Sequence, residues 1–145
     1  MAIKTQSEWV LGRKQTPTSR EAGNVVAQRF EVTAGALASS DIVELAVLPA
    51  HHTIVDAILD MDALDAGITA DVGIMSGTVG DPDNARTCGS ELFSAVDASS
   101  AVFSRVDARS AVTIAPKDSD RSIGVKVSGS VAAGKKIALT LFMVQ

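Results

Sequence analysis

Four groups of residues in this 145-residue chain are of types that could bind a metal ion or take part in catalysis. The first is the run Asp-Pro-Asp-Asn at 81–84, which begins like a calcium-binding loop. A calcium loop of that type needs a glycine at its sixth position and a bidentate acid at its twelfth. The chain has Arg86 and Leu92 at those positions. We therefore interpret the run as a surface turn.

Histidines and aspartates supply two further candidates for metal binding. His51 and His52 are of the residue type that holds the metal ion of small cupin enzymes, but neighbouring side chains of a strand point to opposite faces. Asp56, Asp60 and Asp62 share one face of an alternating segment, where like charges repel unless a cation or a basic partner lies between them. We interpret the histidines as loop residues and the aspartates as a solvated strand face that resists aggregation.

Cys88 is the remaining candidate nucleophile. A nucleophilic thiol needs a base and an orienting acid around it, and no local signature accompanies Cys88. We expect a small buried or loop thiol instead. The chain also contains no G-x-S-x-G, P-loop or H-E-x-x-H motif. The sequence therefore predicts a protein that is not an enzyme, with no catalytic residue, no cofactor and no metal site.

Composition and charge exclude several classes of partner. The formal net charge is -4 and the pI is near 5.0, so the chain lacks the basic surface that neutralises phosphates, and we expect no nucleic-acid binding. No segment approaches 18 uncharged apolar residues, and residues 1–15 carry charges in place of an apolar run. We expect neither a membrane span nor a signal peptide. The single cysteine favours assembly in a reducing cytoplasm, because it cannot form an internal disulfide.

Alternating apolar residues predict β-strands from Val25 onward. The plainest pattern lies at 121–145, where two runs, 123–131 and 135–145, place an apolar residue on every second position. We interpret the two runs as a hairpin. Further strands are expected at 26–33, 41–48, 53–62 and 68–75, with a corner after Pro49.

The number of strands indicates the fold class. About eight strands separated by turn clusters are typical of a sandwich or barrel, and a double-sheet jelly roll fits that number best. We predict an all-β protein: an antiparallel, jelly-roll-like β-sandwich formed by residues 25–145, with at most one short helix. The segment at 90–98 fits either a strand or a short helix.

An internal repeat of ten residues occupies 93–112. The first copy reads FSAVDASSAV and the second, which follows at once, reads FSRVDARSAV. Ten is an even number, so a strand would keep its phase from one copy to the next. Two copies are too few for a solenoid. We interpret the repeat as a tandem duplication tolerated on the surface.

Residues 1–24 differ from the rest of the chain. They hold four cations and two acids, a charge of +2, whereas residues 25–145 hold nine cations and fifteen acids, a charge of -6. Because they lack strand or helix periodicity, we predict an extended N-terminal arm. Its candidate partner-binding residues are Lys4, Trp9, Val10, Leu11, Arg13 and Lys14. The alternatives are a frayed terminus without a role and a Trp9 that folds back over its own sheet.

The layout as a whole resembles the jelly-roll cement, or decoration, proteins of tailed-bacteriophage heads, in particular those of podophage capsids. The resemblance rests on the arm at 1–24, the opening strand VVAQRF at 25–30, a body rich in Ala, Val, Ser and Gly, and the last strand KIALTLFMVQ at 136–145. It implies a virion protein that binds the capsid exterior and bridges neighbouring major capsid proteins. It also implies a homodimer or another homo-oligomer. From the charge and the missing periodicity of residues 1–24, we expect that the arm is mobile in the free protein and becomes ordered only against a capsid subunit.

A carbohydrate-binding β-sandwich module of a virion adhesin is the alternative function. Sugar sites present aromatic faces to the rings of the sugar. The chain has one Trp, four Phe and no Tyr. This scarcity favours the decoration protein over the adhesin.

Overall fold

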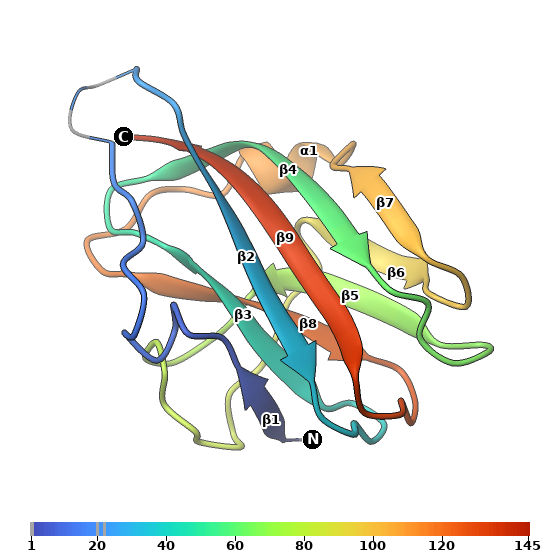
Figure 1. Ribbon diagram of the computed structural model, residues 1–145. Coiled ribbons are helices and arrows are strands. Elements are labelled where there is room, and N and C mark those ends of the chain that lie inside the picture. Colours follow the sequence, from blue (N-terminus) through green and yellow to red (C-terminus); the bar gives the residue numbers. More distant parts are fainter. Residues whose placement is uncertain (1, 20, 22) are drawn as a thin grey trace.

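The computed structural model describes residues 2–19, 21 and 23–145. Within these residues the chain forms a sandwich of two β-sheets with one single-turn helix (Figure 1). The strands are β1 (Ile3–Gln6), β2 (Val26–Ala34), β3 (Ile42–Leu48), β4 (Thr53–Met61), β5 (Thr69–Ile74), β6 (Phe93–Asp97), β7 (Val102–Arg105), β8 (Arg121–Val127) and β9 (Lys135–Val144), and the helix is α1 (Arg109–Val112).

The order of the strands is that of a jelly roll with one strand added. One sheet has the order β1-β3-β8-β5-β6 and the other has the order β2-β9-β4-β7. Without β1, the eight strands β2 to β9 form two four-stranded sheets, and consecutive strands change sheet at every step except from β5 to β6. All pairings among these eight strands are antiparallel. The predicted fold class, an all-β sandwich with at most one short helix, is confirmed.

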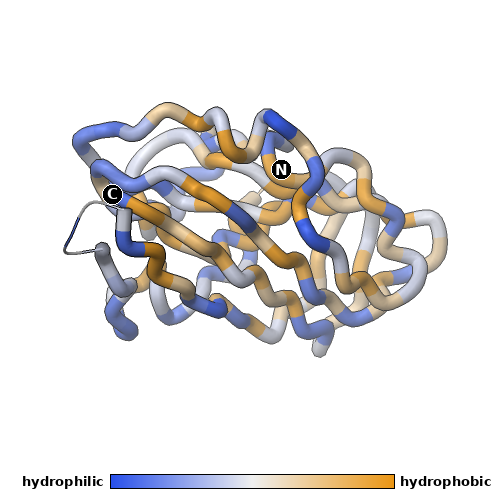
Figure 2. Tube along the Cα trace, turned by 90° about the horizontal axis from the view of Figure 1, so that it is seen from above, coloured by the Kyte–Doolittle hydropathy of each residue, from blue (hydrophilic) through white to orange (hydrophobic). Residues whose placement is uncertain are grey.

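The core lies between the two sheets and is built by alternation along the strands. On β9 the side chains of Ile137, Leu139, Leu141 and Met143 are fully buried, while the residues between them face the other way. Phe30 on β2 is also fully buried and is the largest side chain of this layer. Figure 2 shows hydrophobic residues alternating with hydrophilic ones along the strands. The alternating pattern therefore identified the core-facing residues of β9 correctly. On β4, alternation from Ala57, Leu59 and Met61 would also bury Val55, but Val55 is 43% exposed and Ile54 is buried, because the register shifts between Ile54 and Asp56.

The predicted hairpin between the runs 123–131 and 135–145 is wrong. β8 pairs with β3 and β5, whereas β9 pairs with β2 and β4 in the opposite sheet. Alternation shows which face of a strand is buried, and that face is buried equally well when two strands lie in facing sheets. The corner expected after Pro49 is present, because β3 and β4 belong to different sheets.

The two copies of the ten-residue repeat become edge strands of different sheets. β6 ends the five-stranded sheet and β7 ends the four-stranded sheet (Figure 1). The strand phase expected across the repeat is not kept: Phe93 is 6% exposed and Phe103, at the same repeat position, is 78% exposed. The chain crosses between sheets from one copy to the other, and Ala95 has a positive φ of 50° within the first copy.

The outer face of the five-stranded sheet is covered, which buries β3 on both sides. The loop between β5 and β6 lies over β8: a Cβ atom on Gly124 would lie 2.7 Å from Met75 Sδ. The N-terminal segment lies against β3, where Ser7 N–H donates to Glu44 O at 2.9 Å. The N-terminal segment and the loop between β5 and β6 therefore make both polar and apolar contacts with this sheet. None of the helical structure in the described residues has the length and apolar character needed to cross a membrane.

Candidate functional site

Residues 2–19 are docked on the sandwich, which corrects the expectation of a mobile arm. β1 pairs in parallel with β3, with Ile3 beside Ile42 and Gln6 beside Glu44. Ser7 follows, fully buried, and its Oγ donates to the carbonyl oxygen of Leu45. A polar segment without periodicity can still be ordered in this way, because the exposed edge of β3 offers unpaired backbone groups to any adjacent strand.

His52 binds the C-terminal end of the same segment, at Ser19. Its Nε2 accepts a hydrogen bond from Ser19 N–H at 2.9 Å, and its Nδ1 lies 2.8 Å from the carbonyl oxygen of Ala50, to which it donates in the neutral tautomer. Both ring nitrogens of this buried histidine are therefore used by the protein itself. His51 is exposed and lies 3.6 Å from Asp118. Both histidines lie in the turn after β3, as expected for loop residues.

Between β1 and Ser19 the chain makes a compact turn at residues 8–14. The Trp9 ring meets the Phe30 ring edge to face, with centroids 5.3 Å apart. Lys14 Nζ lies over the indole, 4.6 Å from the ring centroid, a cation–π contact. Arg13 N–H donates to Glu8 O at 2.8 Å, and Arg13 Nη1 pairs with Glu8 Oε1 at 3.2 Å. The indole that was expected to anchor a partner is thus packed against its own sheet.

The structure brings five of the six candidate partner-binding residues together in this turn. Trp9 is half-buried and Val10 is buried at 5% exposure, so both face the body. Leu11, Arg13 and Lys14 are exposed. Lys4 is also exposed but lies on β1, away from the turn. The exposed part of the turn therefore offers one apolar side chain and two cations.

A cleft of about 570 Å³ borders the turn. Its lining includes Trp9, Arg13 and Lys14 from the N-terminal segment together with Val47 and Asp120 from the body. The cleft is large enough to receive one or two side chains of another protein. Sequence reasoning identified the residues of the turn but not the body residues that complete the cleft.

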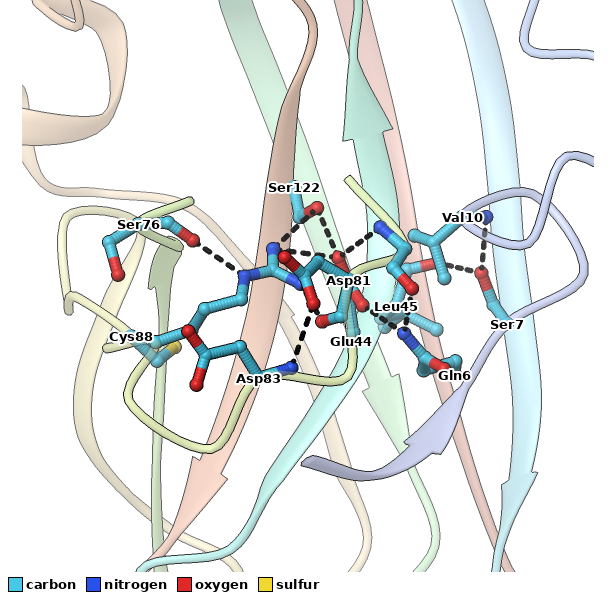
Figure 3. A network of polar contacts seen from close by, with 12 residues as sticks. Gln6, Ser7, Val10, Glu44, Leu45, Ser76, Asp81, Asp83, Cys88 and Ser122 are labelled. Carbon is cyan, nitrogen blue, oxygen red and sulfur yellow. Dashed lines mark hydrogen bonds and ion pairs between the residues drawn. The ribbon is translucent and has the colours of Figure 1, made fainter. Parts of the chain in front are cut away.

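A buried polar network lies beneath the N-terminal segment and the loop between β5 and β6 (Figure 3). Glu44, on β3, is fully buried, and Arg86, from the loop, is 3% exposed. The Glu44 carboxylate accepts hydrogen bonds from Arg86 Nη2 (2.8 Å), Gly80 N (3.0 Å), Gln6 Nε2 (2.6 Å) and Ser122 Oγ. The network therefore joins β1, β3, β8 and the loop through one carboxylate.

Arg86 is held by backbone groups as well as by the carboxylate. Its Nε donates to Ser76 O and its Nη1 to Asp81 O, both at 2.7 Å. Burial acts to raise the pKa of the Glu44 carboxyl, but the four hydrogen bonds outweigh burial and bring the pKa below its ordinary value of 4.5. Glu44 is therefore ionised at neutral pH, and the pair is a structural clamp.

The sequence contains a local signal for one half of this clamp. Glu44 is the one charged residue within the apolar run of β3, IVELAVL. A charge in the middle of a strand buried on both faces requires a buried partner of opposite charge. The identity of that partner, Arg86, depends on the path of the loop and has no local signal.

A second buried arginine lacks such partners. Arg121, at the start of β8, is 8% exposed, and its Nε and Nη2 have no hydrogen-bond partner within the described part of the chain. Burial alone lowers its pKa, since no carboxylate among its neighbours opposes the effect. Hydrogen bonds offset the desolvation cost of Arg86, whereas the cost at Arg121 Nε and Nη2 is not offset.

The surroundings of Cys88, Asp56 and Asp60 account for these residues without catalysis or metal binding. Burial, followed by the charges of Glu91 and Asp71, raises the pKa of the Cys88 thiol to about 12, which keeps it protonated and unreactive at neutral pH. Asp56 pairs with Arg105 at 2.8 Å and Asp60 with Arg29 at 2.9 Å on the outer face of the four-stranded sheet.

The side chains of Asp81 and Asp83 accept hydrogen bonds from backbone groups of the same loop. Asp81 Oδ1 accepts from Asp83 N, and Asp83 Oδ1 accepts from Ala85 N. Over residues 2–19, 21 and 23–145 no group of three or more His, Cys, Asp or Glu side chains is placed to hold a metal ion.

Comparison with known proteins finds similar chains in two solved phage capsid structures. No protein-family model matches the chain, and no curated protein matches it. A chain of the capsid of Ralstonia phage GP4 is 50% identical, with a TM-score of 0.91, over 97% of this chain and 96% of that one. A chain of the cyanophage Pam1 capsid asymmetric unit is 18% identical, with a TM-score of 0.58, over 90% of this chain and 92% of that one. At 18% identity, the similarity to the Pam1 chain shows that the two chains share a fold.

Proposed function

The chain belongs to the family of phage capsid proteins that includes the matched Ralstonia phage GP4 chain, and we propose that it is a decoration protein of the phage head. It is a structural component of the virion. In this proposal it binds the outer surface of the capsid shell, bridges neighbouring major capsid proteins and stabilises the head without enzymatic activity. It acts there as a homodimer or another homo-oligomer, after assembly in the host cytoplasm.

The observation that carries the proposal is the 50% identity with the GP4 capsid chain over nearly the full length of both chains. The size and fold of the chain support a role on the exterior. In this proposal the sandwich of 145 residues meets the shell with one part of its surface, while the rest of its polar exterior stays in water. The resemblance of the sequence to podophage decoration proteins agrees with this role.

The proposed shell-binding surface is the N-terminal segment at 1–24, and in particular the turn at 8–14. Leu11 supplies an apolar contact, and Arg13, Lys14 and Lys4 supply positive charge. An acidic patch on a shell subunit would attract this segment, of charge +2, and repel the body, of charge -6, so charge would set the orientation of docking. Because the turn is already folded, binding does not have to order the chain first.

The experiment that tests the proposal adds the purified protein to phage shells that lack it. We expect saturable binding and a higher temperature of shell disruption. The double variant Leu11→Asp/Lys14→Glu should bind at least about tenfold more weakly, because it loses an apolar contact and reverses a charge. Arg109→Glu is the matched control, since it also reverses a charge but lies on α1, away from the chain that follows β1 (Figure 1).

Three outcomes would contradict the proposal. The first is the absence of binding to shells, and the second is binding that leaves the disruption temperature unchanged. The third is binding to glycans of the bacterial surface without binding to shells, which would assign the adhesin function. Equal losses for Leu11→Asp/Lys14→Glu and Arg109→Glu would retain decoration but place the binding surface elsewhere.

A further inference from the structure

The edge strand β7 combines exposed backbone with an exposed aromatic side chain. Among the described residues β7 pairs with β4 alone, so one of its sides is open (Figure 1). Phe103 on this strand is 78% exposed, well above the next large apolar residue, Val25, at 54%. An open edge of this kind is a template for pairing with another strand.

The hydrogen bonds of β7 define which backbone groups are available. Val106 N–H donates to Ala57 O at 2.8 Å, directly after the ladder that pairs Arg105 with Ile58. The direction of hydrogen bonding alternates along an antiparallel strand, so Ser104 also faces β4. The N–H and C=O groups of Phe103 and Arg105 therefore point away from the sheet, giving two donors and two acceptors.

The register of a two-fold pairing follows from these groups and from the side chains. Pairing centred on Arg105 would place two arginines opposite each other, which is unfavourable. Pairing centred on Phe103 would require Ala101, which lies outside the strand. Pairing centred on Ser104 places Phe103 of each copy opposite Arg105 of the other and uses every outward-facing group.

From this register we propose that a second copy of the chain docks antiparallel on β7, with the two-fold axis at Ser104. The two four-stranded sheets then form one continuous sheet, joined by four backbone hydrogen bonds. On its outer face each Phe103 ring contacts the guanidinium of Arg105 from the other copy. Asp56 already orients that guanidinium through its ion pair at 2.8 Å.

The short strand limits the strength of this pairing. Four residues from each copy bury much less than the roughly 1,000 Å² that a stable interface requires. The pairing is therefore weak in dilute solution and becomes effective where copies are held side by side. This last step rests on the proposed function, because a decorated shell would hold them so.

Disulfide trapping of the free protein tests the proposal without shells. In the Cys88→Ser background, Ser104→Cys would place two thiols across the axis, where paired Cα atoms lie about 4.5 Å apart in the non-hydrogen-bonded position. That separation permits a disulfide. We expect mild oxidation at about 100 µM protein to give a covalent dimer at least about tenfold faster than for Cys88→Ser/Ser94→Cys. Ser94 is the matched control, because it is exposed and has the same repeat position on β6.

A second substitution separates specific pairing from chance collision. Added to Cys88→Ser/Ser104→Cys, Phe103→Ala should slow disulfide trapping at least about fivefold, whereas Val112→Ala, which removes an exposed apolar side chain outside the strand, should leave the rate unchanged. Circular dichroism and thermal melting of each variant establish that the sandwich is folded. Trapping of the Ser104→Cys protein no faster than that of the Ser94→Cys protein, or insensitive to Phe103→Ala, overturns the proposal. Either result leaves the shell-binding test unaffected, so the two proposals fail independently.

Discussion

At the scale of single residues, the chain contains two buried arginines with opposite energetic roles. Arg86 donates to Ser76, Asp81, Glu44 and Ser122 and neutralises a fully buried carboxylate. Arg121 is nearly as buried, yet two of its nitrogens lack partners within the described residues. Burial by itself therefore does not show whether a charge stabilises the fold, because the sign depends on the partners.

We predict that methionine has opposite effects at these two positions. Arg86→Met leaves Glu44 as an uncompensated buried charge and should lower the free energy of unfolding by about 3–5 kcal/mol. Arg121→Met removes unpaired donors and should leave the free energy of unfolding unchanged or raise it by about 1–2 kcal/mol. Urea denaturation of both variants provides the measurement. A large loss of stability in Arg121→Met would show that this guanidinium has a partner.

The Glu44 clamp also predicts a dependence of stability on pH. Its pKa is lowered by folding, so its contribution is present above the ordinary value of about 4.5 and is lost as the pH falls through the folded pKa. Glu44→Gln should be much less stable than wild type at pH 7, and the difference should shrink below pH 4.5. Asp97, whose pKa is lowered by hydrogen bonds from Ser99, is common to both proteins and cancels in the comparison. A difference that stays constant down to about pH 3 would rule out a titrating clamp.

At the scale of elements, the N-terminal segment behaves as part of the sandwich. Gly80, in the loop between β5 and β6, shows how closely the two packed segments approach each other. It has a φ of +81°, and a Cβ atom at this position would lie 2.8 Å from Val10 O. A residue with a side chain would be strained there and would also push the N-terminal turn away. Glycine at this position therefore allows the loop and the turn to pack together.

The packing of Trp9 leads to a prediction for this element. Trp9→Ala removes the edge-to-face contact with Phe30 and the support for Lys14, and it should lower the free energy of unfolding of the isolated protein by about 2 kcal/mol. Leu11→Ala, two residues away and 39% exposed, should change it by no more than about 0.5 kcal/mol. Thermal or urea unfolding of both variants measures the contrast. If Trp9→Ala unfolds like wild type, the segment is held on the body by its polar contacts alone.

At the scale of the whole molecule, the jelly roll closes through strands that are distant in sequence. β9 is the last strand of the chain, but it lies inside the four-stranded sheet between β2 and β4. β1, in contrast, pairs only at the edge of the other sheet. Position in the sheet, rather than position in the sequence, therefore determines how much each end of the chain contributes to folding.

Two truncations test this difference. Deletion of residues 135–145 removes four fully buried side chains and the hydrogen bonds to both neighbouring strands, so the remaining chain should show an unfolded circular dichroism spectrum. Deletion of residues 1–6 should weaken the Glu44 clamp, but the β-sheet spectrum and a cooperative thermal transition should remain. A folded protein without residues 135–145 would contradict the central role of β9.

The sequence by itself determined the class of the fold and, for strands with regular alternation such as β9, the face that is buried. Alternation identified Leu139 and Leu141 as core residues, because side chains of a strand point to opposite faces whatever strand lies beside it. Pro49 and its neighbours indicated the corner between β3 and β4 for an equally local reason. Only the tertiary structure decided that β8 and β9 lie in facing sheets, since pairing depends on contacts between distant segments.

The same distinction applies to the candidate site. The composition of residues 8–14 marked Trp9, Leu11 and Lys14 as residues able to bind a partner. Whether the indole faces a partner or Phe30 depends on where β2 brings that ring, which no pattern within residues 1–24 contains. Glu44 signalled that it needed a buried cation, but Arg86 became that cation because the loop after β5 crosses the sheet. Local periodicity therefore predicts strand faces, whereas contacts between segments far apart in the sequence decide strand pairing, charge compensation and exposure.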